Sequence, residues 1–193
     1  MGGGYFSNAG VFLINTLFGL FILIVMLRFL LQLVRADFYN PVSQFLVKAT
    51  NPVLVPLRRV IPGLFGLDFA AVVLLLVLQI MQIVLVGLVK GYAFQPLGIV
   101  VMAIAELASL TINIFFFSIL IQVILSWISP GNDNPVSGVL YGLNEPLLRP
   151  ARRMIPPLSG FDFSPLVVGV LLKLVEMTLI AWLLNTARGM LLG

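Results

Sequence analysis

The sequence contains no cysteine and no histidine among its 193 residues, and only 9% of the residues are charged. Without cysteine there are no disulfides and no thiolate nucleophiles, and without both residue types most transition-metal sites and haem ligation through either residue are excluded. The sequence also lacks a nucleophile–base pair, a phosphate-binding glycine loop and a metal-ligand cluster. It therefore predicts a non-enzymatic protein with no cofactor and no metal.

Hydrophobic residues, by contrast, make up 61% of the chain, and its mean hydropathy is +1.15. Soluble domains carry a charge on about a quarter of their residues, so this composition predicts a membrane protein. No lysine or arginine lies within residues 1–10, and we therefore expect no cleaved signal peptide. The net charge of +4 reflects where the arginines are placed and does not indicate nucleic-acid binding.

A motif that occurs twice organises the rest of the chain. A shift of 94 residues aligns positions 40–72 with 134–166, and 16 of the 33 aligned positions are identical. Each copy lies between two long apolar runs, so each repeat is expected to hold two membrane spans. Because two spans return the chain to the same side, the repeats should be parallel and related by an axis along the membrane normal.

The predicted fold class is therefore an all-α membrane protein with four transmembrane helices, built as two parallel two-span repeats that each contain a Pro-interrupted amphipathic interfacial segment. Each apolar run can cross about 30 Å of hydrocarbon. The expected divisions are a tail at 1–10, a first repeat at 11–90 (spans 11–34 and 69–89, interfacial segment 40–62), a turn at 91–98, a second repeat at 99–185 (spans 99–128 and 163–184, interfacial segment 134–156) and a tail at 186–193.

The interfacial segments begin with Asn-Pro, which is typical of a capped helix start. A proline disfavours helical geometry in the residue before it, so we expect these helices to end before Pro52 and Pro146. In the first copy, apolar residues at helical spacing predict a face that lies at headgroup level: Val42, Phe45, Leu46 and Ala49. Six residues are interpreted as helix caps: Asn40, Ser43, Asp68, Asn134, Ser137 and Asp162.

Cationic residues predict the orientation. Four lie in residues 35–68 and three in 129–164, against only Lys90 and Arg188 on the other side. The positive-inside bias therefore places both motif loops in the cytoplasm and both termini outside. The arginines that could contact anionic headgroups or a partner are Arg58, Arg59, Arg149, Arg152 and Arg153. Lipid binding, docking of a membrane protein, neutralisation of an ion near a pore mouth and plain anchoring all stay open, as does a homo-oligomer.

Six polar residues lie within the expected spans: Arg28, Gln79, Gln82, Glu106, Lys173 and Glu176. A charge near the bilayer centre costs several kcal/mol unless it is paired or hydrated, so these side chains should face the bundle interior. Lys173 and Glu176 are three residues apart and could pair. We favour the interpretation that these groups hold the helices together, and the alternative is a polar path for an ion or a proton.

The motif residues Asn-Pro-Val-Ser, Glu-Pro-Leu-Leu-Arg-Pro-Ala-Arg-Arg-Met-Ile-Pro and Gly-Phe-Asp-Phe-Ser-Pro-Leu resemble the YggT family of bacterial and plastid membrane proteins, in its two-repeat form. The resemblance covers nearly the whole chain. The first copy departs from the pattern of the second at four positions, where Asn51, Val55, Ala70 and Ala71 replace Glu145, Arg149, Ser164 and Pro165.

The resemblance implies a multi-pass protein of the bacterial inner membrane. It also implies several classes of function, since family members are linked to osmotic-stress tolerance and ion balance, to cell division or nucleoid morphology, and in plastids to assembly of a cytochrome complex. We favour a non-enzymatic scaffold or assembly/morphology factor, because the spans consist overwhelmingly of Leu, Ile, Val and Phe and offer little polar lining for a conduction path. The alternative is an ion-transport-linked or channel-like protein.

Overall fold

The computed structural model describes residues 3–63, 66–92, 95–128, 134–155 and 162–192, and all regular elements in these residues are helical. In chain order they are α1 (Gly3–Leu33), α2 (Pro41–Val60), α3 (Phe69–Lys90), α4 (Pro96–Ile128), α5 (Pro135–Met154), α6 (Ser164–Val175), the π-helical segment η1 (Glu176–Ile180) and α7 (Ala181–Leu192). Four of the described helices are long and apolar enough to cross a membrane: Gly4–Leu33, Phe69–Lys90, Pro96–Ile128 and Ser164–Leu191. The predicted all-α, four-span fold class is confirmed.

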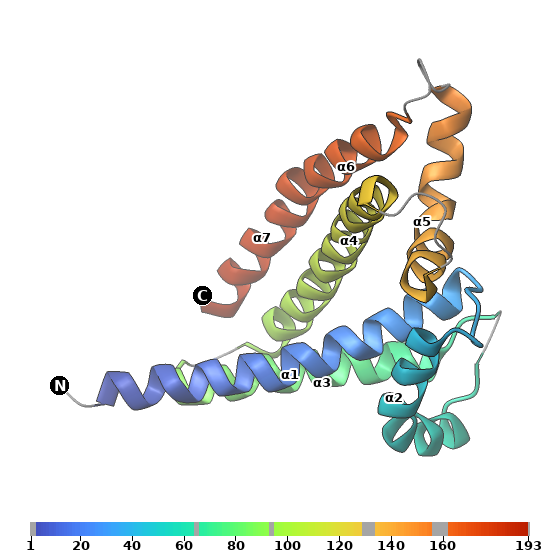
Figure 1. Cartoon of the computed structure of the whole chain (residues 1–193). Helices are drawn as coiled ribbons and strands as arrows, with labels where there is room; N and C mark the ends of the chain where they lie inside the picture. Colours follow the sequence, from blue (N-terminus) through green and yellow to red (C-terminus); the bar gives the residue numbers. More distant parts are fainter. Residues whose placement is uncertain (1–2, 64–65, 93–94, 129–133, 156–161, 193) are drawn as a thin grey trace.

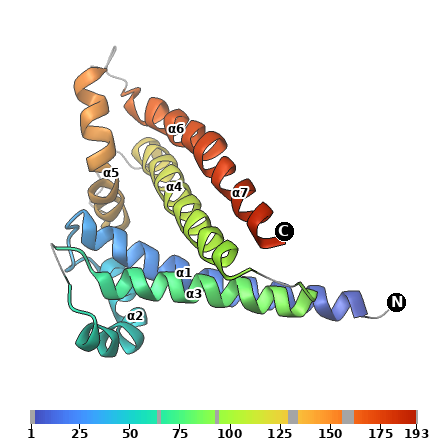
Figure 2. The same cartoon turned by 180° about the vertical axis from the view of Figure 1, so that it is seen from behind.

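The spans form two antiparallel pairs that lie at a steep angle to each other (Figure 1). The first pair is α1 and α3, and the second is α4 with the continuous rod formed by α6, η1 and α7. Helices α2 and α5 both lie at the end of the bundle opposite the two chain termini, as the view from behind also shows (Figure 2). The two motif helices therefore share one side, as parallel two-span repeats require.

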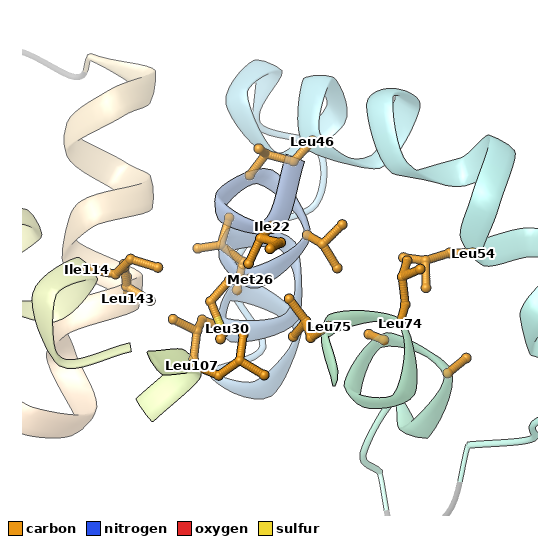
Figure 3. Close-up of a cluster of buried hydrophobic side chains, with 14 residues drawn as sticks. Ile22, Met26, Leu30, Leu46, Leu54, Leu74, Leu75, Leu107, Ile114 and Leu143 are labelled. Atoms are coloured by element: carbon orange, nitrogen blue, oxygen red, sulfur yellow. The ribbon is translucent and has the colours of Figure 1, made fainter. Parts of the chain in front are cut away.

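The main core joins both repeats around α1 (Figure 3). Buried side chains of α1, such as Ile22 and Met26, pack with Leu46 and Leu54 of α2 and with buried leucines of α3, and α4 and α5 reach the same cluster. The second repeat has a smaller cluster of its own, formed by Ile119, Leu148 and Val168. The first repeat is thus enclosed more completely than the second.

The motif helices differ from the sequence-based expectation because they run through their prolines. Helix α2 contains Pro52 and Pro56, and α5 contains Pro146 and Pro150. All four prolines are exposed. Since the two prolines of each helix are four residues apart, the backbone acceptors that they leave unpaired lie on one outer face, where water or headgroups can reach them. The expected breaks before Pro52 and Pro146 were wrong.

The buried face of α2 also differs from the predicted apolar stripe. It consists of Ser43, Leu46, Thr50 and Leu54, whereas the side chain of Phe45 is exposed. Packing of Leu54 against the first span pair continues the helix past Pro52, because the tertiary contacts on that face extend beyond the proline. The segment is therefore one helix of 20 residues that has a packed face and an outer face.

Candidate functional site

The beginnings of the two motif helices touch. The side-chain oxygens of Asn40 and Asn134 accept hydrogen bonds from the backbone of Val42 and Val136 at 2.9 and 3.0 Å, as N-caps do. The amide nitrogen of Asn40 donates across the repeats to the Pro135 carbonyl oxygen at 2.7 Å. One asparagine therefore caps α2 and also joins it to α5.

The two serines of the motif do not act as caps, contrary to expectation. The Ser43 hydroxyl is buried and has no hydrogen-bond partner among the described residues. The part of the chain that the structure describes also offers no side-chain hydrogen bond to Ser137. Asp68 is the N-cap of α3 and accepts from the backbone of Ala71 at 3.3 Å. Asp162 accepts from the backbone of Ser164 at 2.9 Å, but it lies one residue before Phe163, which is the N-cap of α6.

An arginine–aspartate pair closes each motif helix onto the span that follows. Arg58 near the end of α2 pairs with Asp68, which caps α3. At the equivalent positions Arg152 donates to Asp162 at 2.9 Å, and it also pairs with Glu145 at 2.9 Å. The same chemistry, ten residues apart in sequence, fixes the return into the membrane in both repeats.

Both groups of the second pair have shifted pKa values. Burial by itself raises the pKa of Asp162, but hydrogen bonds from Arg152 and Ser164 and the charge of Arg152 outweigh it, so the pKa lies below the usual value. Burial likewise acts to lower the pKa of Arg152, and its contacts with Asp162 and Glu145 raise it on balance. Each partner is therefore held in its charged form.

The five motif arginines are thus used in two ways. Arg58 and Arg152 point inward to the aspartates, whereas the side chains of Arg59 and Arg153 are exposed and meet no hydrogen-bond or ion-pair partner in the described residues. Arg149 is also exposed and pairs with Glu145 at 3.5 Å along the helix. Sequence reasoning grouped these residues together, and their geometry separates them into a structural and an accessible set.

A second polar contact ties each motif helix to the span before it. Arg28 of α1 donates to the side chain of Thr50 in α2, to that of Asn51 at 2.9 Å and to the Val47 carbonyl at 3.2 Å. In the second repeat, Asn144 of α5 donates to Gln122 of α4 at 2.8 Å. Sequence reasoning missed the partners of Arg28 and the whole second contact, although the 94-residue offset from Arg28 to Gln122 points to it.

The remaining intramembrane residues form two clusters of matching design. In the first repeat Gln79 donates to Glu106 of α4 and to Gln82 at 3.4 Å, and Gln82 donates to Asn15 of α1 at 3.0 Å. In the second repeat Lys173 contacts Glu176 at 2.6 Å and Asn113 at 2.9 Å. The Lys173–Glu176 pairing anticipated from spacing is therefore present in the structure.

A cavity with a mostly apolar lining and several polar side chains lies beside the first cluster, at the end of the bundle that carries the termini. Its volume is about 300 Å³. Asn15, Gln82, Tyr92, Glu106 and Arg188 supply its polar lining. Asn15 was not singled out from the sequence, and Arg188 entered only the count of cationic residues. The two residues come from the first and last spans and line the same cavity only once the two pairs pack together.

The two repeats coincide with a known family domain. The family model described as CCB3/YggT matches residues 7–89 and again 101–183. The chain belongs to the CCB3/YggT family. The two matches are displaced by the same 94 residues as the two motif copies, so each contains two spans and the motif helix between them.

Three relatives align with most of the chain. An uncharacterized protein of Pseudomonas aeruginosa is 44% identical over 176 residues, which is 90% of this chain and 89% of that protein. The uncharacterized protein YggT of Escherichia coli is 37% identical over 185 residues, 96% of each chain. A protein of Vibrio alginolyticus encoded in the region 3′ of proC is 42% identical over 163 residues, 83% of this chain and 88% of that one. No solved structure matches the chain.

Glu106, Lys173 and Glu176 contact one another or amide side chains within the spans. The exposed Arg59 and Arg153 lie at the motif end. Paired groups of the first kind stabilise helix junctions, and exposed arginines attract anions.

Proposed function

We propose that this CCB3/YggT-family chain is a non-enzymatic membrane scaffold of the bacterial inner membrane, in which the two motif helices form one basic platform on the cytoplasmic face. The observation that carries the proposal is the direct contact between α2 and α5 at Asn40 and Pro135, together with the exposed side chains of Arg59 and Arg153. A platform built from both repeats presents two basic sites at a fixed separation.

The contacts inside the membrane support bracing over conduction. Glu106 engages Gln79 across the two repeats, and Lys173 engages Glu176 within one helix. Pairing with a neighbouring polar group lowers the free-energy cost of burying a charge in the membrane. A pair between two helices also adds to helix–helix association. These residues act as internal ties that fix the geometry of the platform.

The platform is proposed to bind the phosphates of anionic lipids, with α2 and α5 lying at headgroup level. Large apolar side chains on the outer faces, including Phe45 and Val136, support this placement because they can enter the acyl boundary beside the arginines. Each arginine near an anionic leaflet contributes about 1 kcal/mol of attraction. That attraction weakens as salt shortens the screening length.

The test compares glutamine with lysine at the two accessible arginines. Protein is purified from native membranes, and the co-purified anionic lipid is measured by mass spectrometry. Arg59→Gln with Arg153→Gln should lower the retained lipid several-fold, whereas the two lysine substitutions should keep it. Lys90→Gln, at the opposite end of the bundle, is the charge control and should change nothing.

Two other results would contradict the lipid platform. If both the lysine and the glutamine variants lose the retained lipid at unchanged expression, the arginines make planar bidentate contacts with a protein. Lysine keeps the charge of arginine but not its geometry. If all variants retain the same amount of lipid, Arg59 and Arg153 do not bind lipid.

The orientation is part of the same proposal, with both motif helices cytoplasmic and both termini outside. The cationic asymmetry supports it. Alkaline phosphatase fused after Gly193 should be active, and a green fluorescent protein at the same site should be dark. The reverse pattern would place the arginines on the wrong side for a cytoplasmic platform.

An ion-transport-linked role is the second candidate, and the cavity beside Glu106 is the observation that favours it. A half-buried carboxylate near amide side chains can hold a cation. Ion flux through the reconstituted protein distinguishes this role from that of a scaffold.

A further inference from the structure

The two repeats carry equivalent surfaces that are covered to different extents. In the first repeat, Met26 of α1 and Leu76 of α3 belong to a surface on which α4 lies, and Leu107 of α4 is buried against it. A cavity of about 280 Å³, which Thr111 of α4 also lines, is left between the three helices. The contact is close, since the Thr111 hydroxyl lies 3.6 Å from the Met26 sulfur. This is the main packing contact between the two repeats of the chain.

The same surface in the second repeat, displaced by 94 residues, is open. It forms an apolar groove of about 510 Å³ between α4 and α6, and Leu120, Val170 and Lys173 are part of its lining. Leu120 is 45% exposed, whereas its equivalent Met26 is 4% exposed. No other described element of the chain occupies the place that α4 takes on the first repeat.

The face that would fill this groove is also present and uncovered. Helix α1 is the equivalent of α4, so Leu13, Leu17 and Leu20 correspond to Leu107, Thr111 and Ile114. Leu13 is 58% exposed and Leu107 is 8% exposed, and Leu17 and Leu20 are likewise exposed on the outside of the bundle. Each chain therefore has one open groove and one open copy of the helix face that fills the internal groove.

We propose that a second copy of this chain docks the Leu13–Leu20 face of its α1 into the α4–α6 groove. The packing of α4 on the first repeat within one chain is then repeated by the packing of α1 of the second copy on the second repeat. Such a contact is heterologous, with a different surface on each partner, and it generates a closed ring or an extended row. The proposal does not depend on lipid binding by the motif arginines.

Two further equivalences agree with this docking. The Gln79–Glu106 contact inside the chain corresponds to Lys173 facing Phe12 of the second copy, and Lys173 already lies 4.4 Å from the centre of the Phe116 ring. An ammonium group beside aromatic rings is a favourable pairing away from water. At the motif end, the amide nitrogen of Asn134 has no partner in the described residues. Its equivalent in Asn40 donates to Pro135, which corresponds to Pro41 of the second copy.

A second copy is favoured over a lipid chain because the two surfaces already match in the internal contact. Apolar surface alone does not drive helices together in a bilayer, where association depends on close packing and polar contacts. The internal junction supplies both, because Leu107 of α4 is buried in the main core with Met26 and Leu75, and Gln79 donates a hydrogen bond to Glu106.

Cysteine cross-linking tests the docking cleanly, because the natural chain has no cysteine. Leu17→Cys and Leu120→Cys replace the equivalents of the touching pair Thr111 and Met26. When differently tagged forms of the two single variants are made in the same membrane, mild oxidation should give a disulfide dimer that contains both tags. Neither variant alone should cross-link. In the control mixture, Val77→Cys takes the place of Leu17→Cys and should give no mixed disulfide. Val77 and its equivalent Leu171 are both exposed, so this position lies outside the covered surface in either repeat.

A blocking variant with a matched neighbour completes the test. Val170→Trp enlarges a side chain in the groove, and Leu171→Trp enlarges the adjacent one outside it; both side chains are about half exposed, so neither change disturbs the core. Val170→Trp should reduce the mixed cross-link at least fivefold, and Leu171→Trp should leave it unchanged. Native mass spectrometry from lipid nanodiscs should give multiples of 21.1 kDa.

Three results would overturn the proposal. A dimer of Leu17→Cys with itself shows a symmetric contact of α1. Equal loss of the cross-link in both tryptophan variants shows that the groove is not the docking surface. A 21.1 kDa species that carries only lipid, together with no mixed cross-link, shows that acyl chains fill the groove.

Discussion

Arg28 of α1 donates a hydrogen bond to Thr50 of α2, and the residues 94 positions later form the corresponding link with donor and acceptor exchanged: Asn144 of α5 donates to Gln122 of α4. The contact occupies equivalent positions in the two repeats, although the residue types at both positions differ. Because the contact is kept while the residue types change, its role is to hold the motif helix against the preceding span. Arg28 is buried in this joint and unavailable to a passing ion.

Transplanting the second joint into the first tests that interpretation. Arg28→Gln alone should lower the free energy of unfolding by about 1 to 3 kcal/mol, because hydrogen bonds from a charged donor to Thr50 and Asn51 are lost. Adding Thr50→Asn, which recreates the pairing of Gln122 with Asn144, should recover part of the loss. Thermal unfolding in detergent measures both variants. A double variant less stable than Arg28→Gln would show that the two joints are not interchangeable.

The two arginine–aspartate pairs should differ in their contribution to stability. The Asp68 side chain is 4% exposed and that of Asp162 is 38% exposed. Arg58→Gln leaves a buried carboxylate without its partner and should cost about 3 kcal/mol. Arg152→Gln affects a wetter site and should cost about 1 kcal/mol or less. Arg59→Gln is the control beside Arg58 and should have no effect, and equal losses for Arg58 and Arg152 would contradict this ranking.

Acid should remove the contribution of the second pair. The folded protein lowers the pKa of Asp162 below its unfolded value of about 3.9. The stabilisation is therefore complete above about pH 4 and is lost as the pH falls through the lower folded pKa. The difference in unfolding temperature between the natural protein and Asp162→Asn should stay constant from pH 8 to pH 5 and shrink below pH 4. A difference that grows on acidification would reverse the sign of the linkage.

The Lys173–Glu176 pair should be replaceable by the glutamines of the first repeat. Glu176→Gln alone leaves the ammonium of Lys173 without its charge partner and should cost about 3 kcal/mol. Adding Lys173→Gln restores the Gln79–Gln82 arrangement and should recover most of the loss. A double-mutant cycle measures the coupling. Additive losses would indicate that the two side chains act independently.

The sequence was sufficient for the features that depend on local pattern. The four spans, the helix caps at Asn40, Asn134 and Asp68 and the Lys173–Glu176 contact all follow from hydropathy, helix-start chemistry or spacing of three residues. Family membership was likewise correct, since the motif residues that carry it are contiguous in sequence.

The remaining features depend on tertiary packing. Helix α2 continues through Pro52 because Leu46, Thr50 and Leu54 pack on one face while the prolines are exposed on the other, and local propensity does not register that packing. The Asn40–Pro135 contact and the cavity near Glu106 depend on how the two repeats pack together. The hydrophobic pattern of the sequence does not specify how the two repeats are oriented relative to each other.

In the proposed scaffold, the polar groups inside the membrane brace the helices and do not conduct ions. Potassium and sodium flux into liposomes that contain the purified protein distinguishes the two roles, with empty liposomes as the baseline and Glu106→Gln and Glu176→Gln as variants. We predict flux equal to that of empty liposomes for the natural protein and both variants. Flux well above the baseline that disappears in a folded Glu106→Gln or Glu176→Gln variant would contradict this proposal and establish a transport role.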